Sequence, residues 1–262
     1  MENKKEEWPR NYPVSDKSIL EISIEFLTEI EKRQAENFKK AGKIMGDRIM
    51  KGGLIKPVGT GGHSYIPALD MTHRAGALVT VNPTLDVSSS SINGGMRSMR
   101  LERVLGYFRA LMDYFQVEKD DVVIIFNNVA VGAAPIDAAL ECKERGAIVI
   151  GIGSSIWQDD IPMDYRLRHP SKKNLRDIAD LFIDDCNPMG DTVLKIEGLE
   201  APICPISTIT SGYIVRRIEE EAIRYMLSKG FKPLVWISGN AVGGDEANAK
   251  YEAEYWHKVK ML

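Results

Sequence analysis

A strand–helix–strand pattern in the middle of the chain limits the fold more than any other feature. Val122–Phe126 is a run of five apolar residues, and a second apolar run follows at Ala147–Ile152. Between them, Pro135–Arg145 has a helical composition, with proline near its start and Gly146 after its end. Strands that are apolar on both faces belong inside a parallel sheet covered by helices. The pattern therefore predicts a βαβ unit and an α/β protein.

The flanking segments continue the alternation of strands and helices. The long first helix is predicted to start at a capping box formed by Ser18 and Glu21 and to end at Gly52-Gly53. We expect one three-layer αβα sandwich over residues 18–262, preceded by a solvated arm at residues 1–17. Strands are predicted at Leu54–Val58, Ala77–Val81, Leu181–Asp184, Thr192–Ile196 and Lys232–Trp236, and helices at Asp16–Lys51, Met99–Phe115, Leu175–Ala179, Ser207–Lys229 and Asp245–Lys258.

Composition argues against several classes of protein. Among 262 residues, 44% are hydrophobic and the net charge is -3, which suits a globular core and gives no bulk attraction to nucleic acid or anionic membrane. No apolar stretch approaches the roughly 20 residues of a membrane span, and the charged N-terminus has no signal-peptide core. Cys142, Cys186 and Cys204 are widely spaced and predict neither a disulfide framework nor a metal knuckle. We expect a cytoplasmic protein.

A glycine-rich turn, Gly59–Ser64, directly follows the first predicted strand. Ligands of open parallel sheets bind outside the carboxyl ends of the strands, where backbone N–H groups and the hydroxyls of Thr60 and Ser64 suit an anionic or polyhydroxylated ligand. A dinucleotide fingerprint would need a third glycine where Ser64 stands, and no Gly-Lys-Ser/Thr sequence forms a phosphate-binding loop of the Walker type. His63 either takes part in chemistry or stabilises the turn.

Three further loops carry polar side chains. Asn127–Ala134 follows the central strand, and Ser238–Glu246 follows the last predicted strand, so both are expected at the ligand-binding edge. Thr84–Ser98 is rich in serine and glycine. A loop of that length is either a binding loop or a flexible surface loop.

In their order along the chain, these motifs resemble the sugar isomerase (SIS) domain family, most closely its bacterial phosphosugar-binding members. The resemblance begins with Gly59–Ser64 and Arg74-Ala75-Gly76 and extends over almost the whole chain after the N-terminal arm. It implies a five-stranded parallel sheet of flavodoxin or Rossmann type, and a homodimer or homotetramer with sites near the subunit boundaries. It also implies a phosphorylated or otherwise acidic sugar as ligand. The matching segments continue through Pro135–Gly146, Ile148–Ile152, His169–Leu175, Ala179-Asp180, Gly190-Asp191, Ser207-Thr208, Glu220, Ser238–Asn240, Glu246 and Asn248.

The sequence departs from the family pattern at two places. The loop after the central strand, rich in Ser and Thr in typical members, reads Asn127–Gly132 here and has no hydroxyl. A sulfonate, a carboxylate or an unphosphorylated sugar is therefore an alternative to a phosphosugar. The glutamate that commonly precedes Arg-Ala-Gly is replaced by Asp70, whose side chain is one methylene shorter.

Aldose–ketose isomerisation through an enediol needs a carboxylate or imidazole that moves a proton between neighbouring carbons. The candidate catalytic residues are His63, Asp70 and Glu246, although Glu246 could simply cap the last helix. His63, His73 and Asp70 lack a zinc-site spacing, so neither a metal nor a cofactor is expected. The candidate substrate-binding residues are Gly59, Thr60, Gly61, Gly62, Ser64, Arg74, Asn127, Asn128, Ser207, Thr208 and Asn240, with His169, Lys172 and Lys173 as candidates from a neighbouring subunit.

The predicted function is therefore isomerisation of an acidic sugar by proton transfer. A binding or sensor protein that holds such a ligand without converting it is the alternative, and an etherase-type lyase is a third possibility. No helix-turn-helix segment accompanies the domain in the sequence, which favours an enzyme over a DNA-binding regulator.

Overall fold

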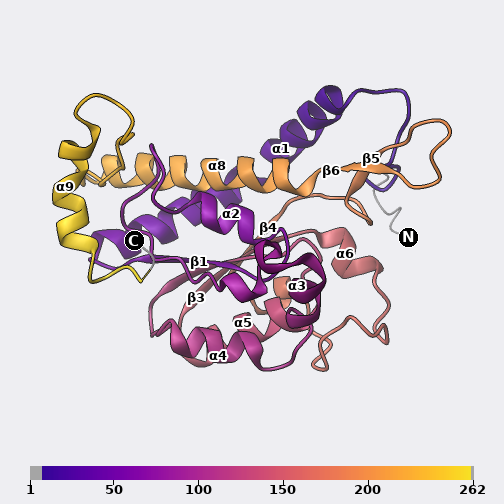
Figure 1. Ribbon diagram of the computed structural model, residues 1–262, viewed down its shortest axis with the longest axis horizontal. Coiled ribbons are helices and arrows are strands. Elements are labelled where there is room, and N and C mark those ends of the chain that lie inside the picture. Colours follow the sequence, from indigo (N-terminus) through magenta and orange to yellow (C-terminus); the bar gives the residue numbers. More distant parts are fainter. Residues whose placement is uncertain (1–7, 261–262) are drawn as a thin grey trace.

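The computed structural model describes residues 8–260 and has a parallel sheet at its centre (Figure 1). Its strands are β1 (Ile55–Gly59), β2 (Val122–Phe126), β3 (Ile148–Gly153) and β4 (Leu181–Asp184), adjacent in sequence order. All three neighbouring pairs are parallel. The predicted α/β class is thus confirmed, with a sheet of four strands rather than five in the described part of the chain.

The predicted strand at residues 77–81 forms only an irregular edge beside β1. Single parallel bridges join Ile55 to Val81 and Val58 to Thr84. Pro83 between them has no N–H to donate, and a proline inside a strand interrupts its ladder. The predicted last strand, residues 232–236, likewise makes one antiparallel bridge, from Val235 to Leu78, and does not join the parallel sheet.

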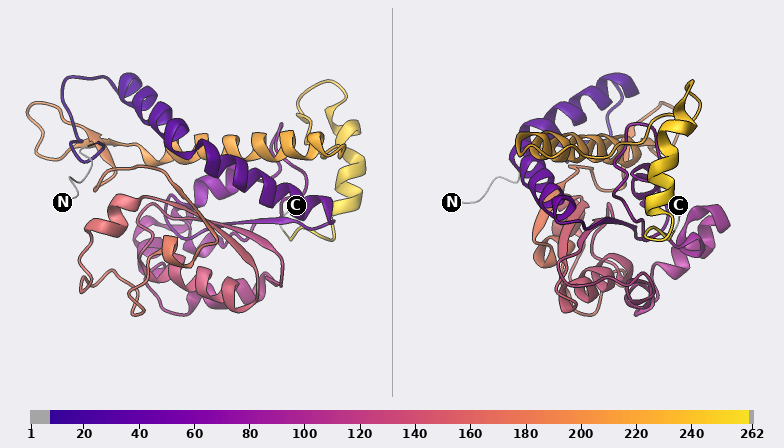
Figure 2. Two further views of the ribbon diagram at one scale, coloured as in Figure 1. Left: turned by 180° about the vertical axis from the view of Figure 1, so that it is seen from behind. Right: turned by 90° about the vertical axis from the view of Figure 1, so that its left-hand side faces the viewer.

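Helices cover both faces of the sheet (Figures 1 and 2). On one face lie α1 (Ile19–Met50), α2 (Tyr65–Asp70) and α8 (Ser207–Ser228), and on the other lie α4 (Tyr107–Tyr114) and α5 (Ala133–Glu144). The strands alternate accordingly. The side chain of Ile124 packs between the sheet and helices α1 and α8. Those of Val123 and Ile125 pack between the sheet and helices α4 and α5.

The long helix predicted at Met99–Phe115 is divided in two. Helix α3 (Gly95–Leu101) ends before α4 begins at Tyr107, and Gly106 between them adopts φ +82°. A left-handed residue ends the helical path, and glycine occupies that conformation at little cost. Glu102 therefore lies in a turn at the end of α3.

The remaining elements are short, apart from the C-terminal helix. Strands β5 (Thr192–Leu194) and β6 (Ile203–Pro205) form a separate antiparallel pair, to which Val14 adds one bridge at Leu194. The predicted arm is therefore packed onto the domain from Trp8 onward, and the ring centroids of Tyr12 and Phe26 lie 5.0 Å apart.

None of the described helices has the length and apolar character that crossing a membrane requires. The bounds of the remaining helices are η1 (Val87–Ser89), η2 (Ser91–Asn93), α6 (Ser155–Asp160), α7 (Leu175–Ile178) and α9 (Gly244–Tyr255).

Helices α1 and α8 approach closely because Gly42 has no side chain. A methyl group on Gly42 would lie 2.6 Å from the backbone carbon of Glu221, too near for any real contact. The predicted capping box of Ser18 and Glu21 forms at the start of α1. It stabilises the N-terminal end of the helix, which is far from the contact at Gly42.

We predict that Gly42→Ala destabilises the protein by about 1–3 kcal/mol, because the added methyl forces α1 away from α8. The matched control is Gly212→Ala in α8, where a methyl group meets nothing within 4 Å. That variant should be neutral or up to about 1 kcal/mol more stable, since alanine is the better helix former. Urea denaturation followed by circular dichroism measures both changes. Equal stabilities for the two variants would contradict the close helix contact.

Candidate functional site

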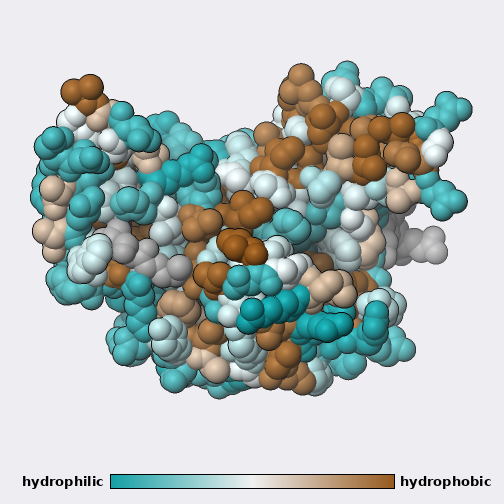
Figure 3. All heavy atoms as spheres, in the orientation of Figure 1, coloured by the Kyte–Doolittle hydropathy of each residue, from teal (hydrophilic) through white to brown (hydrophobic). Residues whose placement is uncertain are grey.

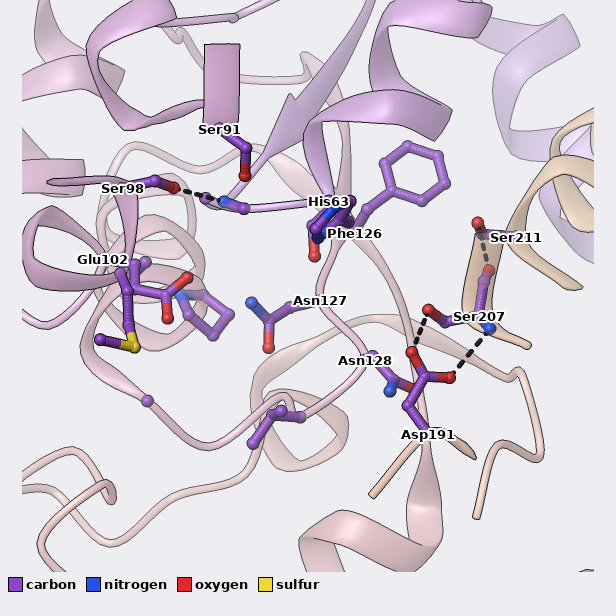
Figure 4. Close-up of a pocket in the computed structure, with 18 of the residues that line it drawn as sticks. His63, Ser91, Ser98, Glu102, Phe126, Asn127, Asn128, Asp191, Ser207 and Ser211 are labelled. Carbon is purple, nitrogen blue, oxygen red and sulfur yellow. Dashed lines mark hydrogen bonds between the residues drawn. The ribbon is translucent and has the colours of Figure 1, made fainter. Parts of the chain in front are cut away.

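A cavity of about 540 Å³ opens at the carboxyl ends of the parallel strands (Figure 4). The turn after β1 and the loop after β2 supply two of its walls, through His63 and Asn127 among others. Helix α3 and the first turn of α8 supply two more, through Glu102 and Thr208. This is the edge at which ligands of open parallel sheets bind.

The glycine turn is shaped by its contact with α3. Gly61 adopts φ +104°, and a methyl group there would lie 2.7 Å from Oε2 of Glu102. The N–H of Gly62 donates to Oγ of Ser98 at 2.8 Å, and that hydroxyl donates to the carbonyl of Ser89 at 2.5 Å. The Ser- and Gly-rich segment at residues 84–98 is therefore a folded wall of the cavity, built from η1, η2 and the start of α3.

Glu102 is the carboxylate that this arrangement brings to the cavity, and the sequence did not single it out. Its side chain is partly buried, and this burial raises its pKa to about 7, with nearby Arg103 opposing the rise. Its carbonyl oxygen accepts the N–H of Ala134 at 3.0 Å, which ties the end of α3 to the start of α5. The one sequence signal for this turn is Gly106, which interrupts the helical pattern four residues later.

Two aspartates line the side of the cavity next to α8. Asp191 accepts hydrogen bonds from the hydroxyl of Ser207 at 2.6 Å and from its N–H at 2.9 Å. Burial raises the pKa of Asp191, which the Ser207 hydrogen bonds and the nearby His63 oppose. Burial raises the pKa of Asp185 well above its usual range, and the neighbouring Asp184 adds to the rise.

The side chains of Asn127 and Asn128 hold their own loop in place. Asn127 donates to Oγ1 of Thr60 at 2.9 Å and accepts the N–H of Ala130 at 2.6 Å. Asn128 accepts from the side chain of Asn187 at 3.0 Å. Thr60 is fully buried, donates to the carbonyl of Phe126 at 2.7 Å and does not line the cavity.

Eight of the predicted site residues line the cavity and the others do not. The turn and loop residues among them come from consecutive strands of the sheet, as predicted, and the helical ones come from α8. Those at the cavity are Gly61, Gly62, His63, Ser64, Asn127, Asn128, Ser207 and Thr208. Those outside its lining are Gly59, Thr60, Asp70, Arg74, His169, Lys172, Lys173, Asn240 and Glu246.

Tertiary contacts explain where the predicted catalytic carboxylates lie. Asp70 is paired with Arg74 and with Arg216 of α8, outside the cavity lining. Glu246 is exposed on α9. The segment before it pairs with Leu78 and not with the parallel sheet, so its loop does not open at the ligand-binding edge.

The basic segment that contains the candidate residues His169 and Lys172 is held by local contacts. His169 lies 3.2 Å from Oδ1 of Asp137 and 2.8 Å from Oγ of Ser171. Lys172 donates to the carbonyl of Met163 at 2.7 Å.

His73 packs edge-on against the ring of Trp236. Across residues 8–260, no three His, Cys, Asp or Glu side chains are grouped so that they could hold a metal ion.

Comparison with known proteins places the chain in a family. A model described as SIS domain matches residues 20–154. A UPF0309 protein of Geobacillus sp. (strain WCH70) is 34% identical over 238 residues, which cover 91% of this chain and 94% of the relative. A UPF0309 protein of Thermoanaerobacter pseudethanolicus is 33% identical over 251 residues, which cover 93% of this chain and 100% of the relative.

Among solved structures, a phosphoheptose isomerase from Neisseria gonorrhoeae is similar in fold. The two align with a TM-score of 0.50 and 16% identity, covering 78% of this chain and 92% of that chain. An identity this low supports the fold alone. The family match spans both the glycine turn and the βαβ unit from which the cavity is built. The chain therefore belongs to the SIS domain and UPF0309 families.

Proposed function

We propose that the cavity isomerises a phosphorylated or otherwise acidic sugar between its aldose and ketose forms through an enediol. The observation that carries this proposal is Glu102, a carboxylate in the cavity wall whose pKa is raised to about 7. Both of its protonation states are populated at neutral pH, as a group that takes up and returns a proton requires. Apolar side chains such as Phe126 and Trp157 line the same cavity and reduce its contact with water.

In this reaction Glu102 removes the proton from C2 of the aldose. The electron pair of that C–H bond forms the double bond between C1 and C2, while the oxygen on C1 receives a proton from His63, giving the enediol. Glu102 then returns its proton to C1, and the hydroxyl on C2 gives its proton to His63 as the C2 carbonyl forms. His63 lines the cavity from within the glycine turn, whose Gly61 lies against Glu102. No proton is gained or lost over the cycle.

We assign the base to Glu102 in preference to Asp70 and Glu246, because neither of those lines the cavity. Asp185 and Asp191 line it too, but Asp185 accepts the N–H of Asn187, and Asp191 accepts the hydroxyl and the N–H of Ser207. Hydroxyl groups around the cavity can hold the hydroxyls of a sugar. Ser64, Ser91 and Ser211 come from three separate segments of the chain, so they can contact different parts of one ligand.

We predict that Glu102→Gln lowers solvent exchange at the carbon next to the carbonyl by at least about 100-fold, because the amide cannot accept the proton. Deuterium uptake in D₂O, followed by NMR over a panel of sugar phosphates and sulfo-sugars, measures this loss. The matched control is Glu219→Gln, since burial also raises the pKa of Glu219 to about 7 but this residue of α8 does not line the cavity. Full exchange by Glu102→Gln would remove Glu102 from the mechanism. Binding of many sugars without exchange in the wild type would favour the sensor function.

We also predict that exchange by the wild-type protein is lost as the pH falls through about 7. The sign follows from the role of Glu102, since only the ionised carboxylate accepts a proton and ionisation is complete above its raised pKa. The pH profile of kcat/KM for the exchanging sugar tests this. A profile that is flat between pH 5 and pH 8 would contradict the assignment.

A further inference from the structure

Four arginines differ from the others because they have neither an ion pair nor a side-chain hydrogen bond among the described residues. In the part of the chain that the structure describes, arginines elsewhere contact a carboxylate or a carbonyl oxygen, including the highly exposed Arg74 and Arg224. Within residues 8–260, no ion pair or side-chain hydrogen bond involves the four remaining guanidinium groups. Exposure alone does not account for this difference, because Arg74 and Arg224 are exposed and paired. The four are Arg97, Arg100, Arg103 and Arg166.

Two of these arginines, Arg103 and Arg166, lie at or beside the cavity, and the other two lie on α3, which supplies part of its wall. Arg97 and Arg100 are three residues apart on α3, so they lie on the same side of that helix, and Arg103 follows at its end. Arg103 and Arg166 together line a hollow of about 140 Å³ with Leu167. Because Arg103 and Leu167 also line the main cavity, the hollow adjoins it. Figure 3 shows strongly hydrophilic side chains gathered over α3.

The start of α5, by contrast, is poorly suited to an anion. A helix N-terminus binds anions through first-turn N–H groups that have no partner within the helix. Here the N–H of Ala134 donates to the carbonyl of Glu102 at 3.0 Å, and Pro135 has no N–H. Of the four N–H positions at this helix start, only those of Gly132 and Ala133 are left for a ligand among the described residues. The side chain of Asn127 in the preceding loop is already bonded to Thr60 and Ala130.

The charges around the cavity also favour the rim. Asp185 and Asp191 line the side next to α8, where a second anion would be repelled or would force them to stay protonated. Arg103 and Arg166 are exposed, and within residues 8–260 neither makes an ion pair or a side-chain hydrogen bond. A guanidinium group pairs with a phosphate or carboxylate through two parallel hydrogen bonds, which gives both affinity and orientation.

We propose that Arg103 and Arg166 bind the anionic group of the ligand at the cavity rim, in place of a seat at the start of α5. The group is a phosphate, a sulfate or sulfonate, or a carboxylate, and the sugar extends from it inward to Glu102. The identity of the ligand as an acidic sugar rests on the proposed function. The location of the anion rests on the arginines that are unpaired within residues 8–260 and on the partly occupied start of α5, where Ala134 is bonded to Glu102 and Pro135 has no N–H.

Titration calorimetry with inorganic phosphate tests the location without any turnover. Arg103→Gln and Arg166→Gln should each weaken phosphate binding at least about tenfold, as the loss of one charge-assisted pair implies. The control is Arg224→Gln, which removes the same charge from an exposed arginine of α8 paired with Glu220, and it should bind as the wild type does. Wild-type protein that binds no phosphate would overturn the proposal, as would arginine variants that bind it unchanged. Binding that survives both arginine variants but is lost in Ala133→Asp would place the anion at α5.

The exchange assay separates this proposal from the proposed function. For a sugar phosphate and its unphosphorylated parent, the preference in kcat/KM for the phosphorylated form should fall at least about tenfold in Arg103→Gln and Arg166→Gln, and not in Arg224→Gln. If exchange occurs and the preference does not change, the rim site is wrong and the isomerase stands. If no sugar exchanges but phosphate binding depends on the two arginines, the rim site stands and the isomerase fails.

Discussion

The structure depends on strands that must be covered on both faces. Val123 and Ile125 of β2 face one layer of helices and Ile124 faces the other, and all three are fully buried. Such a sheet can expose only its ends, so the loops that carry polar residues are collected at one edge. The close contact of α1 with α8 at Gly42 holds one of the two helical layers together.

At that edge, a second constraint shapes the site. The glycine turn after β1 fits against Glu102 only because Gly61 has no side chain, and Ser98 fastens the turn to α3. The partly buried carboxylate is consequently held at the cavity wall in an environment that disfavours its charge. The contact between Gly61 and Glu102 thus positions the glycine turn and also helps to bury the carboxylate, which raises its pKa.

The polar groups around the cavity differ in whether they are already bonded within the protein. Asn127, Thr60 and the N–H of Ala134 are occupied by bonds within the protein, so these groups are not free to hold a ligand. The lack of hydroxyls in the loop after β2, visible in the sequence, pointed in the same direction. Arginines at the rim offer the alternative contact for an acidic group, and their lack of protein partners distinguishes them from the arginines elsewhere in residues 8–260.

The sequence alone determined the α/β class, the βαβ unit, the glycine turn at the ligand edge and the resemblance to the SIS family, because each depends on neighbouring residues or local periodicity. Tertiary structure decided which carboxylates reach the cavity. Asp70 is drawn into ion pairs with Arg74 and Arg216, and the chain before Glu246 pairs with Leu78. Glu102 enters because α3 ends early and its turn packs on Gly61. Apart from the Asp70–Arg74 pair, these contacts join residues far apart in sequence, so no local pattern encodes them.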